Sequence, residues 1–232
     1  MADIISVKTI AEVKKIIQEK VAHKDKALVF CDVDMTLVMP TEKAVRYPTI
    51  KKNALRYYWI LRKNADKTKT MITLLTPPKL IEADAPKVMK NLGVRTILFT
   101  ACFSGKLGPY ASVKEMKSEA TKKLGYDFSG TFKKDLMAPV FYKGILFSEA
   151  EGEKGRVMVQ FIEKMGLQNL ETIVMVDDRD GNLKDAQKAV KIAFPKMKFI
   201  GIEYGGAYNL SEPTTSEEFS KAWNNAAELA AQ

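Results

Sequence analysis

Short apolar runs alternate with stretches of helical period along most of the sequence. The pattern predicts helices at 7–21, 49–65, 82–93, 112–125, 153–166, 181–193 and 216–231. It predicts strands at 27–32, 95–101, 172–178 and 198–205. Strands that are apolar on both faces and separated by helices are typical of a sheet covered by helices on both sides. We therefore expect an α/β fold with a doubly wound, mostly parallel sheet.

Three local features add detail to this pattern. Residues 130–148 resemble short strands or a hairpin, and the polar segment 62–70 (RKNADKTKT) suggests a solvated loop. Gly93 is expected to cap the helix at 82–93. A chain of 232 residues with 46% hydrophobic content can build one sizeable core. We expect a single domain over residues 1–232.

Composition excludes several kinds of chemistry. Cys31 and Cys102 are too few for a disulfide framework, and Leu37 and Gly108 stand where a cysteine-based phosphatase would need an arginine six residues after its nucleophile. The one histidine, His23, lies in a polar segment, where a solvated role is expected. No apolar run approaches the length of a membrane span, and the N-terminus lacks the order of a signal peptide. These features predict a cytoplasmic protein, with export into a host cell without a classical signal peptide as the alternative.

Acidic residues follow two of the predicted strands. Asp32 and Asp34 end the first, and Asp177 and Asp178 end a later one. Ligands bind at the carboxyl ends of parallel strands, and carboxylates that meet there repel one another unless a cation joins them. Mg²⁺ takes oxygen ligands and often shares its site with a phosphate. The pattern therefore predicts a site for Mg²⁺ and phosphate.

These residues also carry a family resemblance. The segment DVDMTL (32–37) matches the DxDxT signature of the haloacid dehalogenase (HAD) superfamily of phosphohydrolases, after the usual apolar strand. The remaining motifs follow in the family's order, as Thr100 in ILFTA, Lys154 in EKGRVMVQFI and Asp177/Asp178 in IVMVDDRDGNL. The chain further resembles a bacterial HAD subfamily of mostly unassigned activity, which includes effector phosphatases of intracellular pathogens.

The resemblance implies a role for each motif residue. Asp32 would be the nucleophile that forms an aspartyl-phosphate, and Asp34 the acid and then the base. Asp32, the backbone carbonyl of Asp34 and Asp177 would hold Mg²⁺, with Asp178 orienting the ligands. Thr100 and Lys154 would bind the phosphoryl oxygens, and Thr36 would stabilise the loop.

Two assignments within the motifs have alternatives. Lys143 in FYKGILFS could replace Lys154, but Lys154 opens a helix beneath the acidic strand and is favoured. In DDRDGN, the direct metal ligand could be Asp177, Asp178 or Asp180, in that order of preference.

HAD enzymes control access to the site through insertions between the motifs. Here the insertions at about 40–75 and 126–150 are too short for a full α/β lid, so we expect a small helical and hairpin cap that admits bulky substrates. The segment 46–63 places four aromatic residues among lysines and arginines, either as a rim for a phosphoaryl group or, as we favour for most of them, packed inward. These residues are Tyr47, Tyr57, Tyr58 and Trp59. The basic helix at 112–125 is expected to expose a solvated face.

The sequence thus predicts a Mg²⁺-dependent phosphomonoesterase. Phosphotyrosine in peptides is the leading substrate, and small esters such as nucleotides or sugar phosphates are the alternative. The net charge of +9 favours anionic partners and leaves a second class open, a non-catalytic module that binds nucleic acid or acidic lipid. The lack of a zinc finger, an RNA-binding aromatic motif or an uninterrupted basic tract argues against nucleic acid.

Overall fold

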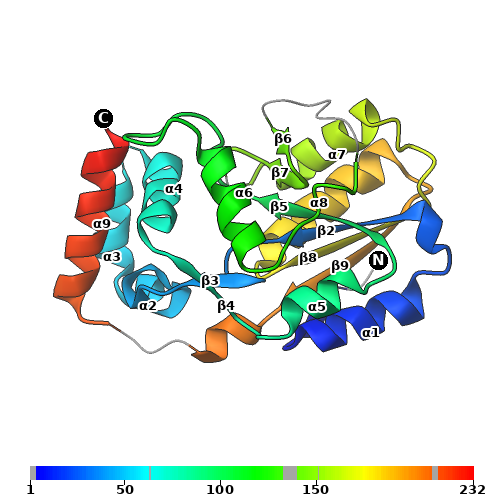
Figure 1. Ribbon diagram of the computed structural model, residues 1–232, viewed down its shortest axis with the longest axis horizontal. Helices are drawn as coiled ribbons and strands as arrows, with labels where there is room; N and C mark the ends of the chain where they lie inside the picture. Colours follow the sequence, from blue (N-terminus) through cyan, green and yellow to red (C-terminus); the bar gives the residue numbers. More distant parts are fainter. Residues whose placement is uncertain (1–3, 63, 133–139, 151, 211–213) are drawn as a thin grey trace.

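The structure, a computed structural model, describes residues 4–62, 64–132, 140–150, 152–210 and 214–232. Its centre is a seven-stranded sheet of order β1-β9-β8-β2-β5-β7-β6 (Figure 1). Every neighbouring pair is parallel except β6 and β7. The strands are β1 (Ile4–Val7), β2 (Ala27–Asp32), β5 (Arg95–Thr100), β6 (Phe141–Tyr142), β7 (Ile145–Phe147), β8 (Thr172–Asp177) and β9 (Lys198–Tyr204). The predicted α/β fold with a mostly parallel sheet is confirmed.

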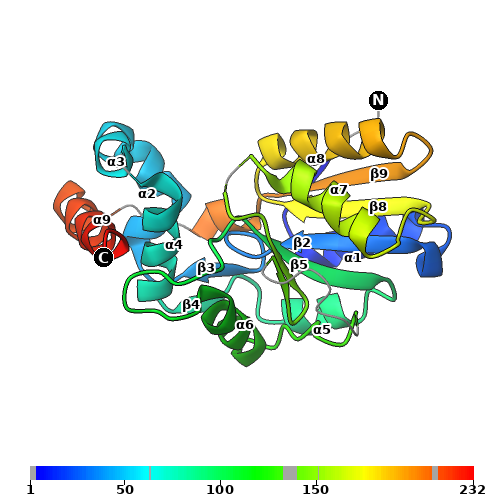
Figure 2. The ribbon, with the colours of Figure 1, turned by 90° about the horizontal axis from the view of Figure 1, so that it is seen from above.

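Helices cover both faces of this sheet (Figure 2). Alternate residues of β2 serve the two layers, since Leu28 and Phe30 pack with one hydrophobic cluster and Val29 and Cys31 with the other. The first cluster includes α7 (Lys154–Lys164) and α8 (Asp180–Ala193). The second includes α1 (Ile10–Lys20), α5 (Ala85–Lys90) and the start of α6 (Val113–Lys123). The all-apolar strands of the sequence are therefore buried on both sides.

A second layer of helices stands beside the carboxyl edge of the sheet (Figure 1). It contains α2 (Tyr47–Lys52), α3 (Ala54–Leu61), α4 (Ala65–Leu75) and the closing helix α9 (Ser216–Ala230). A two-stranded ribbon of β3 (Val38–Pro40) and β4 (Pro78–Leu80) connects it to the core. Short 3₁₀ turns lie at Lys24–Lys26 (η1), Lys43–Val45 (η2) and Gly206–Leu210 (η3). The helical cap expected at 40–75 thus shares its layer with the last helix of the chain.

Several local predictions need correction. The predicted helix at 49–65 is two helices, because the backbone leaves helical geometry at the buried Asn53. The predicted loop at 62–70 contains the start of α4, whose Thr68, Met71 and Ile72 are buried; Lys63 lies outside the described residues. Threonines at these spacings hide the apolar period. Helix α5 ends at Lys90 with Asn91 as its cap, and Gly93 follows two residues later at a φ of 74°.

The described part of the second expected insertion, 126–150, lies at the edge of the central sheet and not in the second layer of helices. It contributes β7 and β6 to that edge, so the short strands predicted at 130–148 are present in the described part. Residues 133–139 lie outside the described residues. The short strand β1 was not predicted, because four residues before a helical period give little signal.

Candidate functional site

Strand β2 ends at Asp32, and a tight loop follows. Met35 adopts a left-handed φ of 67°, and its amide donates to the carbonyl of Val38 at 2.7 Å. This turn places the Thr36 hydroxyl so that it donates to Asp32 Oδ2 at 2.9 Å. Thr36 therefore orients the carboxylate of Asp32 as well as stabilising the loop.

Lys154 links the two acidic strand ends. It is the first residue of α7 and only 1% exposed. Its Nζ donates to Asp32 Oδ1 at 2.6 Å, to Asp177 Oδ2 at 2.7 Å and to the Phe99 carbonyl at 3.3 Å. The ammonium thus stands between two buried carboxylates from β2 and β8.

Asp177 and Asp178 are held in different ways. Asp177 Oδ1 accepts from the backbone amide of Arg179 and from Asn182 Nδ2, both at 2.9 Å. Asp178 Oδ2 accepts from the Tyr208 hydroxyl at 2.6 Å. Each carboxylate therefore has a fixed orientation before any ligand arrives.

Carboxylate oxygens of Asp32, Asp177 and Asp178 lie within 4.8 Å of one another, and all three residues are buried. The ammonium of Lys154 offsets only one of these three carboxylates, so the fully ionised cluster carries net negative charge. Hard oxygen donors at this spacing fit a divalent cation such as Mg²⁺. Among the described residues, these are the ones whose placement suits a metal.

Burial and mutual repulsion change the proton affinity of the cluster. Burial raises the pKa of Asp32 to about 8; Lys154 acts in the opposite direction, and the charges of Asp177, Asp178 and Asp34 add to the increase. Burial and the charge of Asp177 raise the pKa of Asp178 to about 6. The pKa of Lys154 is raised, because the charges and hydrogen bonds of Asp177 and Asp32 outweigh the effect of burial. Without a metal, the cluster therefore tends to retain a proton at neutral pH.

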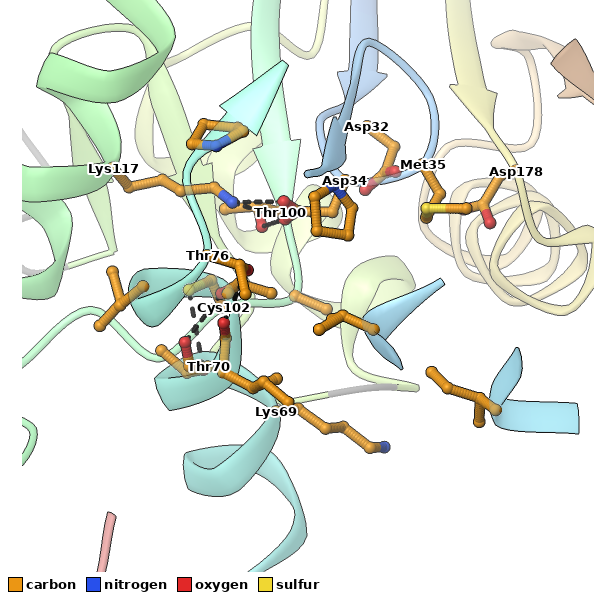
Figure 3. A pocket seen from close by; sticks show the side chains of 18 of the residues that line it. Asp32, Asp34, Met35, Lys69, Thr70, Thr76, Thr100, Cys102, Lys117 and Asp178 are labelled. Carbon is orange, nitrogen blue, oxygen red and sulfur yellow. Dashed lines mark hydrogen bonds and ion pairs between the residues drawn. The ribbon is translucent and has the colours of Figure 1, made fainter. Parts of the chain in front are cut away.

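Asp34 lies outside this carboxylate cluster. Its Oδ1 and Oδ2 accept from Lys117 Nζ at 2.5 and 2.7 Å, and Oδ2 also accepts from the Thr100 hydroxyl at 3.2 Å. Figure 3 shows Lys117 extended toward Asp34, with Thr100 beside them. The side chain predicted as acid and base is thus fixed by an ion pair, while the predicted metal contact of its backbone carbonyl stays a prediction.

Lys117 is the site residue that sequence reasoning missed. The helix at 112–125 was expected to show a solvated basic face, yet Lys117 is 7% exposed. Burial lowers its pKa, but the charge of Asp34 outweighs that effect and the pKa is raised. The available signal was its helical spacing from Val113 and Thr121, which share its buried face.

A cavity of about 210 Å³ is lined at one side by Asp32, Asp34 and Asp178 (Figure 3). Its walls come from the core and from the second helical layer, and they include Ile50, Tyr57, Ile72, Met116 and Trp223. Thr70 and Thr73 of α4 and Thr76, which caps that helix, also line it.

The hydroxyls of these threonines are already engaged. Thr73 and Thr76 donate to the carbonyls of Thr70 and Ile72, both at 2.8 Å. Thr70 Oγ1 accepts from the Phe103 amide at 3.1 Å. The wall away from the aspartates therefore presents mainly apolar groups to a ligand. Lys69 is a charged residue in that wall.

The remaining sequence candidates lie elsewhere. Lys143, the alternative to Lys154, is exposed, and its Nζ lies over the Tyr142 ring at 5.1 Å. Asp180 pairs with Lys184 at 2.5 Å on the surface of α8 and does not join the cluster. Cys31 and Cys102 are buried free thiols, as expected. Burial raises the pKa of Cys102 to about 11.

The aromatic residues of 46–63 divide between the inside and the surface. Tyr57 packs edge-on against Trp223 with ring centroids 4.8 Å apart. Tyr58 and Trp59 are 68% and 60% exposed, so the prediction that most of these rings pack inward is wrong for them. The side chain of Tyr47 lies outside the described residues. His23 is exposed, as expected, and contacts Glu171.

A family model matches most of the chain. The sequence model of a family described as "Protein of unknown function (DUF2608)" matches residues 6–230. A search of curated proteins finds no match. In the described part of the chain, no helix combines the length and apolar character needed to cross a membrane.

Proposed function

The chain belongs to the DUF2608 family, and we propose that it is a Mg²⁺-dependent phosphomonoester hydrolase of the haloacid dehalogenase type. One observation carries the proposal: buried Lys154 bridges Asp32 and Asp177 at 2.6 and 2.7 Å, with Asp178 in the same cluster. An ordinary surface ion pair joins two exposed charges and needs neither burial nor additional carboxylates. A cluster that keeps excess negative charge in a buried place is suited to a cation and a phosphate.

Asp32, Asp177 and Asp178 are the residues that would hold the metal. Each carboxylate has room for further bonds, since two oxygens offer about four acceptor positions. When bound, Mg²⁺ supplies positive charge that offsets the carboxylates and the phosphoryl oxygens.

Asp32 is the proposed nucleophile. Its carboxylate attacks phosphorus, a bond forms between Asp32 and phosphorus, and the bond from phosphorus to the ester oxygen breaks. Thr36 and Lys154 each hold one oxygen of Asp32, which restricts its rotation before the attack. Lys154 and Thr100 are the proposed donors to the phosphoryl oxygens.

Asp34 is the proposed proton carrier. It gives a proton to the departing ester oxygen, and it then takes one from the water that attacks phosphorus and releases Asp32. Only the ionised form of Asp34 makes the ion pair with Lys117. The ion pair and the hydrogen bond from Thr100 hold the Asp34 carboxyl beside the cavity, which supports its use in both steps.

The departing oxygen decides how much a proton from Asp34 contributes. A phenol, with a pKa of about 10 as in tyrosine, needs less help from an acid than an alkyl alcohol does. The apolar wall of the adjoining cavity also suits an aromatic ring better than a sugar. We accordingly propose aryl phosphates, with phosphotyrosine in peptides as the leading substrate and small phosphate esters as the alternative.

The experiment is a hydrolysis assay of the purified chain with and without Mg²⁺. The panel contains p-nitrophenyl phosphate, phosphotyrosyl and phosphoseryl peptides, a sugar phosphate and a nucleotide. We expect Mg²⁺-dependent release of phosphate, fastest from the aryl esters and abolished by Asp32→Asn. Asp180→Asn is the matched control, since Asp180 makes a surface ion pair outside the cluster.

The outcomes distinguish the candidate functions. Hydrolysis that Asp180→Asn removes and Asp32→Asn does not would contradict the assigned site. Salt-dependent nucleic-acid binding without any hydrolysis would favour the non-catalytic alternative. The two buried free thiols fit a reducing compartment, so we propose that the enzyme acts in a cytoplasm, either that of its own cell or, after export, that of a host cell.

A further inference from the structure

The outward face of α3 carries an unusual group of exposed apolar side chains. Leu55, Tyr58 and Trp59 are 80%, 68% and 60% exposed. The other exposed large hydrophobic side chain in the described part of the chain is Ile192, on α8. Spacings of three and four residues place the three side chains of α3 on one helical face. Isolated surface hydrophobics are common, but a group on one face indicates an interaction.

Packing of the opposite face fixes this helix in place. Leu61 is buried, and Tyr57 contacts the ring of Trp223 on α9. Arg56 Nη1 donates to the carbonyl of Ser216, and the Ser216 hydroxyl donates to Asn53 Oδ1, both at 2.9 Å. Figure 2 shows α3 at the outer end of the helical layer, away from the sheet. The exposed group is thus held at an edge of the molecule.

The charged residues in the segment of sequence that contains α3 are all positive. Between positions 43 and 65 there are seven lysines and arginines and no aspartate or glutamate. Of these, Lys43 on η2 is exposed, and so are Lys51, Lys52, Arg56 and Arg62 on or next to α2 and α3. The Arg62 guanidinium lies 5.2 Å from the Trp59 ring centre. Glu217 and Glu218 lie in the first turn of α9, next to Ser216, which accepts from Arg56. The nearby acidic residues are therefore on the Arg56 side of α3.

We propose that the α3 face, defined as Leu55, Tyr58, Trp59 and the exposed cations on or next to α2 and α3 (Lys51, Lys52, Arg56 and Arg62), binds the surface of membranes that contain anionic phospholipids. Tryptophan and tyrosine favour the boundary between headgroups and acyl chains, and lysine and arginine attract acidic headgroups. Three apolar side chains that project from a short helix suit a fluid interface, which closes around them. Binding through one short helix is reversible and salt-sensitive. This proposal goes beyond the phosphatase proposal and does not depend on it.

The two tryptophans of the chain provide a direct test. Trp59 is exposed, whereas Trp223 is 2% exposed and its indole donates to the Ala44 carbonyl at 2.9 Å. Vesicles of phosphatidylcholine with phosphatidylserine should shift the tryptophan emission to shorter wavelength, and brominated acyl chains should quench it. The shift should persist in Trp223→Phe and disappear in Trp59→Phe. Vesicles of phosphatidylcholine alone should give a much smaller signal.

Co-sedimentation with the same vesicles tests the residues. We expect Lys51→Gln/Lys52→Gln to weaken binding about tenfold at low salt, and Leu55→Ser/Tyr58→Ser to weaken it by at least as much. Ile192→Ser, which removes an equally exposed side chain from α8, should bind like the wild type. Absence of vesicle binding at low salt would overturn the proposal, as would an equal loss in Ile192→Ser. Binding to an acidic peptide with none to vesicles would assign the face to a protein partner instead.

Discussion

Lys117 on α6 donates to both carboxylate oxygens of Asp34, at 2.5 and 2.7 Å, and so joins this helix to the loop after β2. Met116 and Ala120, which flank Lys117 on the same helix, line the adjoining cavity. Helix α6 therefore connects the place where an organic group would lie with the carboxyl that would protonate it. In the proposed reaction, Lys117 is a positioning residue that acts through Asp34.

Lys117→Met should change which esters are hydrolysed best. Loss of the ammonium removes the ion pair that positions Asp34, and alkyl esters depend more on its proton, so the preference of kcat/KM for aryl over alkyl phosphates should rise about tenfold. The measurement is kcat/KM across esters whose alcohols differ in pKa. Lys122→Met on the exposed side of α6 is the control, and Lys117→Arg should retain most of the wild-type preference. An unchanged dependence on the alcohol pKa would show that Lys117 has only a structural role.

Lys154→Met should destabilise the fold. Removal of this ammonium leaves buried carboxylates without their partner, and the loss in unfolding free energy should be about 3 kcal/mol. Asp32→Asn should cost less, because Lys154 retains Asp177. Urea denaturation in EDTA compares the two variants, and added Mg²⁺ should recover part of the loss. Equal stability of Lys154→Met and wild type would contradict the charge balance that we describe.

The metal-free protein should be more stable at pH 6 than at pH 8. The pKa values of Asp32 and Asp178 are raised to about 8 and about 6, so between about pH 4 and 8 the folded state binds more protons than the unfolded chain. The unfolding free energy therefore falls as the pH rises through this range. Thermal denaturation in EDTA should show the decrease, and Asp178→Asn or saturating Mg²⁺ should reduce it. A Tm that rises from pH 6 to pH 8 in EDTA would contradict these shifts.

Ala120→Leu should narrow the cavity without touching the carboxylates. We expect kcat/KM for a bulky aryl phosphate such as naphthyl phosphate to fall about tenfold, because a pocket of fixed size has no room for both groups. Acetyl phosphate, whose organic group is small, should be hydrolysed at nearly the wild-type rate and serves as the internal control. Equal effects on both substrates would place the organic group outside this cavity.

The ends of the strands could be predicted from the sequence, and so could the acidic cluster. Asp32 and Asp177 follow apolar runs that only a buried parallel strand explains, and sheet topology brings such ends together. Lys154 was predicted from the resemblance of EKGRVMVQFI to a family motif, and its place at the start of a helix favoured it over Lys143. For the acidic residues a local pattern and a general rule about sheets were sufficient.

The rest depended on packing that local patterns do not show. Lys117 is one of four lysines in α6, and its burial follows only from how that helix lies on the core. Helix α4 was hidden because Thr68 and Thr70 are buried although threonine reads as polar. Tyr57 and Trp59 are two residues apart, yet one faces α9 and the other faces outward.

The hydrogen bond from Trp223 to Ala44 spans 179 positions of sequence and joins α9, whose Trp223 lines the cavity, to the turn η2. During synthesis, β2 and the residues up to α4 leave the ribosome long before α9 does. The cavity wall therefore cannot close until the last helix is made, whereas pairing within the central sheet can start earlier. A nascent chain that already holds Asp32 and Lys154 would still lack this part of the wall, so selectivity among substrates would be acquired only after α9 is made.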